Sequence, residues 1–208
     1  MLALDAPSDA AQKLVDFLHL IEKWNKVYNL TAVRQPGDMV HRHLMDSLVV
    51  LPWLKGSKIA DVGSGGGLPG IPLAVMRPDV RFTLIDSSGK KTRFIRHAAR
   101  KLALDNVRVA RCRVEDYDDA SAFDTVISRA FAALDDFVRM AGHLCGPGGR
   151  LLAMKGVLPP AGSQQLPEGW SVEGVHKLEV PGLDAERHVL LLRNLRRNQR
   201  LPGPDEAE

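Results

Sequence analysis

The sequence predicts an α/β fold in which five parallel strands form a central sheet with helices on both faces. Short apolar runs alternate with helix-like segments from Lys58 onward, a pattern typical of parallel sheets covered by helices. About 55 residues of amphipathic helical pattern precede this region, and two extended segments joined through Pro181 and Gly182 follow it. With 208 residues, of which 45% are hydrophobic, the chain can form one domain with a sizeable core.

Residues 1–55 are predicted to form a helical extension packed on this sheet. Its first helix is expected to be capped near Asp9, and apolar residues recur at helical spacing as far as Trp24. Its second helix has an apolar face from Val40 onward. We expect that helix to end at Pro52, because proline cannot continue a helix.

The α/β domain is expected to span residues 56–193. Buried strands are predicted at 58–62, 81–86, 107–111, 123–128 and 150–154. The helices between them are predicted at 70–76, 90–102 and 133–144, and a tight turn at 146–149 leads into the fifth strand. Segments 170–178 and 188–193 are predicted to close the sheet as an antiparallel pair. Residues 194–208 are expected to be disordered, because they turn from basic to Pro/Gly-rich to acidic.

Composition excludes several functional classes. No apolar stretch approaches the roughly 20 residues that a membrane-spanning helix needs, and the N-terminus lacks the features of a signal peptide. Cys112 and Cys145 lie far apart without metal-ligand spacing, which favours a reducing compartment and argues against structural zinc. We therefore expect a cytoplasmic protein with no membrane partner and no metal, and a monomer, because the short chain has no obvious apolar patch.

A glycine-rich loop directly follows the first predicted strand. Gly65, Gly67 and Gly70 match the G-x-G-x-x-G pattern of dinucleotide-binding proteins, so a nicotinamide dinucleotide is one candidate ligand. Asp61 at the strand end favours another, because it would repel a pyrophosphate and attract the α-ammonium of an amino-acid-like ligand. The prolines at 69 and 72 also remove backbone donors that a pyrophosphate would use. The loop therefore favours S-adenosylmethionine over a dinucleotide.

Further candidate residues follow the next strands. Asp86 ends the second strand, where an acid can accept hydrogen bonds from ribose hydroxyls of either cofactor. Val114 and Glu115 follow the third strand, where an adenine ring needs an apolar edge and a polar contact. Arg129 and Lys155 follow the fourth and fifth strands. Ligands of open α/β sheets bind at the carboxyl ends of the strands, so both are candidate functional residues, with structural ion pairing as the alternative.

These motifs, taken in order, resemble the class I S-adenosylmethionine-dependent methyltransferases, which have a Rossmann-like sheet of seven strands. More narrowly, they resemble the ribosomal RNA small subunit methyltransferase G family, also called the glucose-inhibited division protein B family. The resemblance covers roughly residues 10–193. It is carried by the segments 29–31, 42–44, 46–47, 61–65, 68–72, 128–131 and 155–156. One departure is Gly66, where some members have proline.

The resemblance implies a function and a set of contacts. Members of this family transfer a methyl group to guanine N7 in a 16S ribosomal RNA loop near the decoding centre of the small subunit. Matched position by position, the cofactor contacts of the family fall on Gly63, Leu68, Val114, Glu115 and Arg129. Gly65, Asp61 and Asp86 join this set from the reasoning above. A methyltransferase with a protein or small-molecule acceptor and a non-catalytic cofactor-binding module are the alternatives.

The basic residues predict an RNA-binding surface. Residues 1–104 contain 15 Lys and Arg against 9 Asp and Glu, whereas residues 105–208 contain 13 against 16, and no acid occurs between 87 and 104. The helix at 90–102 places its basic residues opposite its apolar ones. The residues expected to contact phosphates are Lys90, Arg93, Arg96 and Arg100 of this helix and Arg34, Arg42 and His43 of the extension. A merely solvated basic face is the alternative reading of the helix.

The expected chemistry needs positioning rather than proton transfer. Guanine N7 already carries an in-plane lone pair, so no general base is required. Arg129 and Lys155 are the candidate catalytic residues, with Arg129 contacting cofactor, guanine O6 or phosphate. His43, Asp46 and Ser47 also fit a simple network within one helix.

Overall fold

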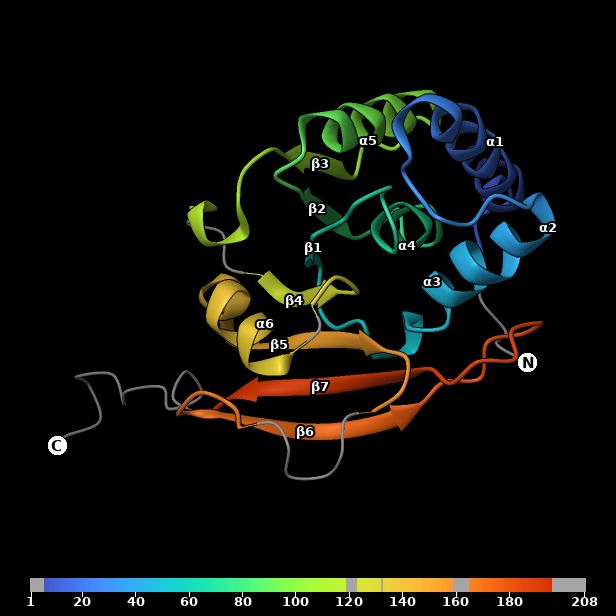
Figure 1. The fold of residues 1–208 in the computed structure, drawn as a ribbon. Helices are drawn as coiled ribbons and strands as arrows, with labels where there is room; N and C mark the ends of the chain where they lie inside the picture. Colours follow the sequence, from blue (N-terminus) through green and yellow to red (C-terminus); the bar gives the residue numbers. More distant parts are fainter. Residues whose placement is uncertain (1–5, 119–122, 132, 159–164, 196–208) are drawn as a thin grey trace, which may run out of the picture.

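Seven strands form one mixed sheet in the order β3-β2-β1-β4-β5-β7-β6 (Figure 1). The computed structural model describes residues 6–118, 123–131, 133–158 and 165–195. The strands are β1 (Lys58–Val62), β2 (Arg81–Ile85), β3 (Val107–Ala110), β4 (Phe123–Ser128), β5 (Cys145–Lys155), β6 (Trp170–Lys177) and β7 (His188–Asn194). Strands β1 to β5 pair in parallel, and β7 pairs antiparallel with both β5 and β6. The predicted parallel sheet and its closing antiparallel pair are confirmed.

Helices cover both faces of the sheet, as predicted. The helical elements are α1 (Ala10–Tyr28), α2 (Pro36–Met39), the π-helical η1 (Val40–Met45), α3 (Asp46–Leu48), α4 (Gly70–Met76), α5 (Gly89–Lys101) and α6 (Leu134–Ala141). Short 3₁₀ turns are η2 (Leu51–Trp53), η3 (Val114–Asp116) and η4 (Gly142–Leu144). Figure 1 shows α1 and α5 above the sheet and α6 on its other side.

Two hydrophobic clusters form the core, one on each face of the sheet. Adjacent strand residues alternate between them, because successive side chains of a strand point to opposite faces. Ile59 belongs to the cluster under α1, α4 and α5, where Phe17 and Phe94 stack with ring centroids 6.2 Å apart. Ala60 belongs to the cluster under α6, which contains Phe137. The sheet is therefore buried on both sides, and its strand ends remain for ligand contacts.

The helical extension differs in detail from the prediction. Helix α1 continues beyond Trp24 to Tyr28 and ends where Asn29 adopts a left-handed conformation, with φ of 49°. Asp9 makes no side-chain cap and instead forms an ion pair with Lys13 at 2.9 Å. The second predicted helix is an uninterrupted helical run over α2, η1 and α3 that ends before η2. Pro52 lies inside the η2 turn, so the prediction that it ends the helix is wrong.

The predicted turn at 146–149 is also wrong, because these residues lie within β5. They form an irregularity in the pairing with β4, which jumps from Phe123 opposite Cys145 to Thr125 opposite Arg150. A Cβ on Gly149 would lie 2.6 Å from the Phe123 carbonyl oxygen. The glycines therefore permit a bulge in a strand rather than a turn before it.

Three other expectations concern the C-terminal tail, membrane-spanning helices and metal ligands. The expected disordered tail falls mostly on residues 196–208, which lie outside them, while Asn194 belongs to β7. In the part of the chain that the structure describes, no helix is both long and apolar enough to cross a membrane. Within the same residues, no three His, Cys, Asp or Glu side chains gather as metal ligands.

Candidate active site

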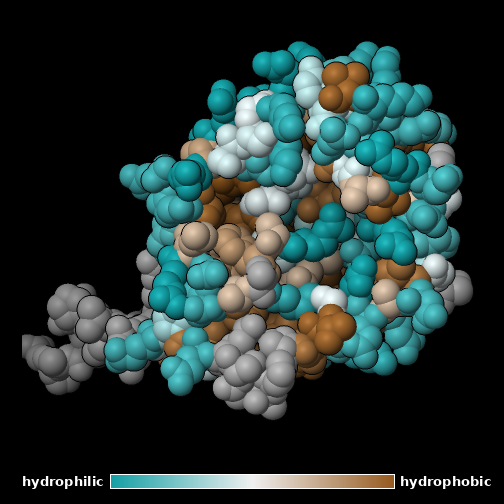
Figure 2. Space-filling model, viewed as in Figure 1, coloured by the Kyte–Doolittle hydropathy of each residue, from teal (hydrophilic) through white to brown (hydrophobic). Residues whose placement is uncertain are grey.

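The glycine loop after β1 forms a crevice at the carboxyl ends of β1 and β2. The Asp86 carboxylate accepts hydrogen bonds from the backbone N–H of Gly65 at 2.9 Å and of Ser88 at 2.8 Å. Gly65 has a positive φ of 56°, and the nearest atom to a Cβ built there is the Gly63 carbonyl oxygen, 3.9 Å away. This side of the loop is therefore open to a ligand. Figure 2 shows the same face hollowed at its centre, between α5 and α6, with hydrophilic residues around the rim.

At Gly63, Gly67 and Gly70, protein atoms occupy the space that a Cβ would take. A Cβ on Gly63 would lie 2.7 Å from the Cβ of Ala130, one on Gly67 would lie 2.8 Å from Cγ1 of Ile71, and one on Gly70 would lie 2.6 Å from Oδ2 of Asp61. A Cβ on Gly66 would lie 3.8 Å from Leu30, so Gly65 and Gly66 are the loop glycines with room for a ligand. Leu68 is buried, its backbone N–H donates to the Ser64 carbonyl at 3.0 Å, and its peptide bond to Pro69 is cis.

Asp61 is fully buried beneath this loop. Its Oδ2 accepts a hydrogen bond from the backbone N–H of Gly70 at 2.9 Å, while Oδ1 has no hydrogen-bond partner among the described residues. Burial raises the pKa of Asp61 to about 7, against the opposing effects of the Gly70 hydrogen bond and the Arg129 charge. A buried acceptor without a partner is costly. A cationic ammonium group would satisfy it, so this residue fits the amino-acid end of S-adenosylmethionine.

The predicted adenine contacts lie at the same edge of the sheet. Val114 and Glu115 form part of η3, which follows β3. Val114 is half-buried against the core cluster under α6, and Glu115 is exposed. An apolar side chain beside an exposed carboxylate suits a purine ring with an exocyclic amine.

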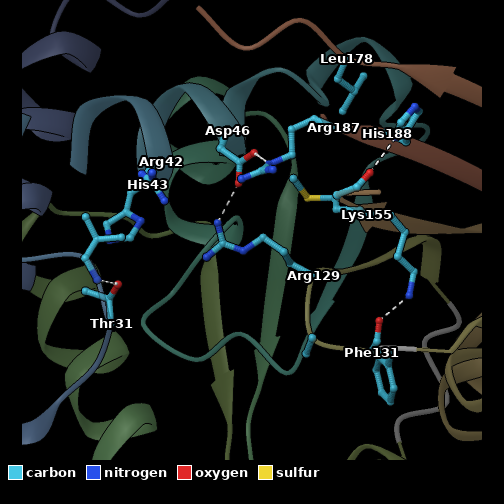
Figure 3. A pocket seen from close by; sticks show the side chains of 14 residues that line it. Thr31, Arg42, His43, Asp46, Arg129, Phe131, Lys155, Leu178, Arg187 and His188 are labelled. Carbon is cyan, nitrogen blue, oxygen red and sulfur yellow. Dashed lines mark hydrogen bonds and ion pairs between the residues drawn. The ribbon is translucent and has the colours of Figure 1, made fainter. Parts of the chain in front are cut away.

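A second cavity, which we call the acceptor pocket, has a volume of about 560 Å³ and lies beside this crevice (Figure 3). It opens between the helical extension, the carboxyl ends of β4 and β5, and the connection from β6 to β7. Its lining residues are Thr31, Val33, Arg42, His43, Asp46, Arg129, Ala130, Phe131, Met154, Lys155, Gly156, Leu178, Arg187 and His188. Of the predicted cofactor contacts, only Arg129 also lines this pocket.

Asp46 organises one wall of the acceptor pocket. Its buried carboxylate bridges two arginines, with Oδ2 3.1 Å from Nη1 of Arg129 and Oδ1 2.6 Å from Nε of Arg187. These bonds join the helical extension to the end of β4 and the start of β7. Sequence reasoning allowed an ion pair for Arg129 but missed Arg187 and the bridging role of Asp46. The positive charge of Arg129 also lowers the pKa of Asp61, so a residue of the pocket wall acts on the buried acid beneath the loop.

A π-helical turn, η1, directly precedes Asp46. In η1 the backbone N–H of Asp46 reaches back to the carbonyl of His41, five residues earlier, which shifts the phase of the helix. Arg42 and His43 lie within this turn, and both line the pocket. Single π turns occur frequently at functional sites.

Lys155 lies at the opposite wall of the pocket. Its ammonium group donates a hydrogen bond to the carbonyl oxygen of Phe131, which follows β4. Partial burial lowers the pKa of Lys155. The structure thus brings Arg129 and Lys155, the two predicted catalytic residues, to one cavity from neighbouring strand ends.

The residues predicted to contact RNA fall into two environments. Lys90, Arg93, Arg96 and Arg100 are exposed on α5, opposite its buried face, as the helical pattern predicts. Arg34 and Arg42 are exposed on the extension. His43 is not on this exposed surface: it is buried, with 3% exposure, and burial lowers its pKa. The Ser47 hydroxyl donates to the backbone carbonyl of His43, which confirms the predicted helix network in part.

Comparison with solved structures supports this description of the fold. A solved S-adenosylmethionine-dependent methyltransferase from Aquifex aeolicus superposes with a TM-score of 0.57 at 16% identity, over 74% of this chain and 92% of that one. The chain therefore has the class I S-adenosylmethionine-dependent methyltransferase fold, with a Rossmann-like seven-stranded sheet.

Relatives of similar length share about half of its residues. A ribosomal RNA small subunit methyltransferase G from Xanthomonas campestris is 52% identical over 91% of this chain and 89% of its own length. One from Escherichia fergusonii is 49% identical over 87% of each chain. A family model described as rRNA small subunit methyltransferase G matches residues 10–190. The chain thus belongs to the rRNA small subunit methyltransferase G family.

Proposed function

We propose that this protein transfers a methyl group from S-adenosylmethionine to N7 of a guanine in 16S ribosomal RNA, in the small-subunit loop near the decoding centre. The observation that carries the proposal is a cationic acceptor pocket beside the glycine loop: Ala130 lines the pocket, and its Cβ occupies the space next to Gly63 of the loop. The family assignment supports ribosomal RNA as the substrate. The choice of N7 and of this loop rests on the resemblance described above.

The crevice residues fit the cofactor in four places. Asp61 would hold the ammonium group through its unpartnered Oδ1, and Asp86 would accept from the ribose hydroxyls. The open side of Gly65 leaves room for the cofactor against the loop, and Gly63 and Leu68 complete the loop that would hold it. Val114 and Glu115 would hold the adenine at η3. When bound, the cofactor supplies a methyl group on a positively charged sulfur.

The acceptor pocket has the charge expected for a nucleotide site. Arg42, Arg129, Lys155 and Arg187 line it with a single acid, Asp46, so a phosphate group would be attracted. Asp46 fixes the two arginine side chains before substrate arrives, which lowers the entropy lost on binding. The pocket can therefore hold one splayed nucleotide of a loop, the form in which proteins read single-stranded RNA.

The residues of the chain act by aligning the guanine with the methyl group of the cofactor. Guanine N7 needs no deprotonation, so the pocket has to fix the base with this lone pair on the line of the methyl group and to exclude water. Alignment of this kind can contribute about 7–11 kcal/mol. Arg129 and Lys155 have only N–H donors, and a donor on N7 would block the reaction. We therefore assign both to guanine O6 or phosphate, where they position the base.

A wider surface would bind the rest of the RNA. The exposed residues Lys90, Arg93, Arg96 and Arg100 of α5, together with Arg34 and Arg42, are proposed to contact phosphates. Such contacts carry no sequence information and weaken with salt. We propose that the protein acts on the small subunit or its RNA as a cytoplasmic monomer.

The test is a mass-spectrometric inventory of 16S RNA nucleosides from cells with and without the gene. We expect one N7-methylguanosine to disappear with the gene and to return when the purified protein and labelled S-adenosylmethionine are added to small subunits. An unchanged inventory would refute the proposal. Label in protein or free nucleosides would indicate another acceptor, and cofactor binding without transfer would indicate a regulatory module.

A further inference from the structure

The imidazole of His43 is the most unusual polar group in the acceptor pocket. His43 lines the pocket but is only 3% exposed. Neither Nδ1 nor Nε2 has a hydrogen-bond partner among the described residues. Figure 3 shows the side chain beside Arg42 and Thr31, on the side of the pocket formed by the helical extension. The ring thus lies in the wall of a cavity that can hold a ligand, with two buried nitrogens that have no partner among the described residues.

Leaving such a group without partners has a cost. A buried donor or acceptor that loses its partner costs about 1–3 kcal/mol, and a leucine or phenylalanine would avoid this cost. Nothing in the packing of the helix requires an imidazole, because the backbone carbonyl of His43, not its ring, receives the Ser47 hydroxyl. The energetic argument therefore favours a ligand that supplies the missing partner.

The His43 ring differs from the other polar groups of the pocket because neither of its nitrogens is bonded to a described residue. The four cations donate only, and both Asp46 oxygens accept from arginines. The Thr31 hydroxyl oxygen accepts from the backbone N–H of Val33 at 3.1 Å. Nδ1 of His188 lies 2.7 Å from the Gly156 carbonyl oxygen, which leaves its Nε2 as a second imidazole acceptor. Burial is the main cause that lowers the pKa of His43, against the opposing effects of the Arg42 backbone and the Asp46 charge, so the ring is neutral near pH 7 and keeps one acceptor nitrogen.

An acceptor of this kind would add to the selection of guanine that donors to O6 provide. Adenine also carries an N7 lone pair, so N7 itself cannot distinguish the two purines. They differ on the neighbouring edges, where guanine has O6, N1–H and an exocyclic amine, and adenine has an amine and an unprotonated N1. Arginine and lysine can read O6, but only an acceptor can read the N–H groups of guanine.

We propose that His43 helps to select guanine, by accepting a hydrogen bond from its N1–H or exocyclic amine through a ring nitrogen. This inference rests on the proposed function and adds a residue that determines base specificity. It also replaces the expectation that His43 contacts a phosphate, because a buried neutral ring is a poor partner for that anion.

The experiment uses the variants His43→Phe and His43→Gln, with His41→Phe as a matched control. His41 lies two residues away on the same helical turn, and its Nδ1 lies 2.8 Å from the Pro181 carbonyl oxygen, so its ring already has a partner. The substrates are small subunits from cells lacking the gene, with either guanine or adenine at the target position. Affinity for S-adenosylhomocysteine and thermal unfolding are measured without RNA.

Opposite effects of the two histidines are expected. His43→Phe should unfold at an equal or higher temperature than the wild type, bind S-adenosylhomocysteine normally, and lose at least about 10-fold in kcat/KM on guanine subunits. Its preference for guanine over adenine should narrow by a similar factor. His43→Gln, whose amide can still accept, should regain part of both. His41→Phe should unfold at a lower temperature and keep the preference for guanine.

The outcomes separate this inference from the proposed function. If the wild type methylates guanine subunits and His43→Phe keeps the same rate and preference, the role of His43 is refuted while the function stands. If His43→Phe unfolds early and loses cofactor binding as well, the ring is structural and the inference is again wrong. If the wild type methylates no ribosomal RNA, both the function and this inference fail.

Discussion

The cofactor crevice and the acceptor pocket lie side by side but are built in different ways. The loop of the crevice is tied by hydrogen bonds from backbone N–H groups to the carboxylates of Asp61 and Asp86, and the bonded residues are at most 21 positions apart. The pocket is held by ion pairs from Asp46 to residues 83 and 141 positions away. A local motif can carry the binding of a cofactor that many enzymes share, whereas the site for a particular acceptor is assembled from distant side chains.

The largest effect is expected from Asp46→Asn, which removes the charge that the two arginines share. We expect a loss of about 2–4 kcal/mol in the free energy of unfolding, at the lower end of the range for a broken buried pair, because Arg129 and Arg187 stay 32% and 25% exposed. Methyl transfer to small subunits should fall steeply. Urea denaturation and initial rates measure the two losses.

Cofactor affinity is the control for this variant. Because Arg129 is a predicted cofactor contact that also pairs with Asp46 in the pocket, the dissociation constant of S-adenosylhomocysteine for Asp46→Asn should rise only a few-fold, much less than methyl transfer falls. A loss of cofactor affinity equal to the loss of RNA methylation would show that the two regions form one site.

The next effect comes from alanine at two glycines of the crevice. Gly65→Ala places a methyl group in open space, so it should cost only about 1 kcal/mol of stability for its positive φ but weaken S-adenosylhomocysteine binding by about 10- to 100-fold. Gly67→Ala meets Ile71 instead and should mainly destabilise the fold. Calorimetric titration and thermal unfolding of both variants test this. If Gly65→Ala bound S-adenosylhomocysteine as tightly as Gly67→Ala does, a ligand at Gly65 would be contradicted.

A smaller effect is the pH dependence caused by Asp61. Its pKa of about 7 in the folded protein lies above the ordinary value near 3.8, so the folded state binds the extra proton between these values. The ligand-free protein should therefore lose stability as the pH rises from about 4 to about 7. Asp61→Asn should lack this part of the slope. Unfolding free energies across this range measure it, and a slope unchanged by the substitution would contradict the assignment.

Cofactor binding should show the opposite pH trend. An ammonium group beside Asp61 favours the carboxylate, so S-adenosylhomocysteine should bind more tightly as the pH rises from about 5.5 to about 7.5. The same titration of Asp61→Asn should be nearly flat. This result would place the ammonium group of the cofactor beside Asp61, in the crevice.

The smallest effects are expected on α5. Arg93→Gln and Arg100→Gln should each weaken binding to small subunits only a few-fold and reduce the salt slope by about 0.7–0.9 per lost contact. Because both side chains are exposed, stability should change by less than about 0.5 kcal/mol. Arg139→Gln, on α6 at the other face of the sheet, is the matched control. If all three variants had the same salt slope, the basic residues of α5 would form a solvated surface that does not contact RNA.

The sequence predicts the sheet and the loop after β1 well because their signals are local. Apolar runs mark the strands, and Asp61 with its glycines marks the loop. The π turn η1, which carries Arg42 and His43 at the pocket, has no such signal in the apolar pattern. Nothing near Arg187 in the sequence indicates that it meets Asp46, 141 residues away, because such ion pairs depend on tertiary packing.

A crystal structure of the protein with S-adenosylhomocysteine tests the separation of the two regions most directly. The amino group should lie within hydrogen-bonding distance of Asp61, the ribose beside Asp86 and the adenine at Val114, with the space between Arg187 and Lys155 left open for a nucleotide. A ligand bound instead between Asp46, His43 and Lys155 would contradict the assignment of both the crevice and the pocket.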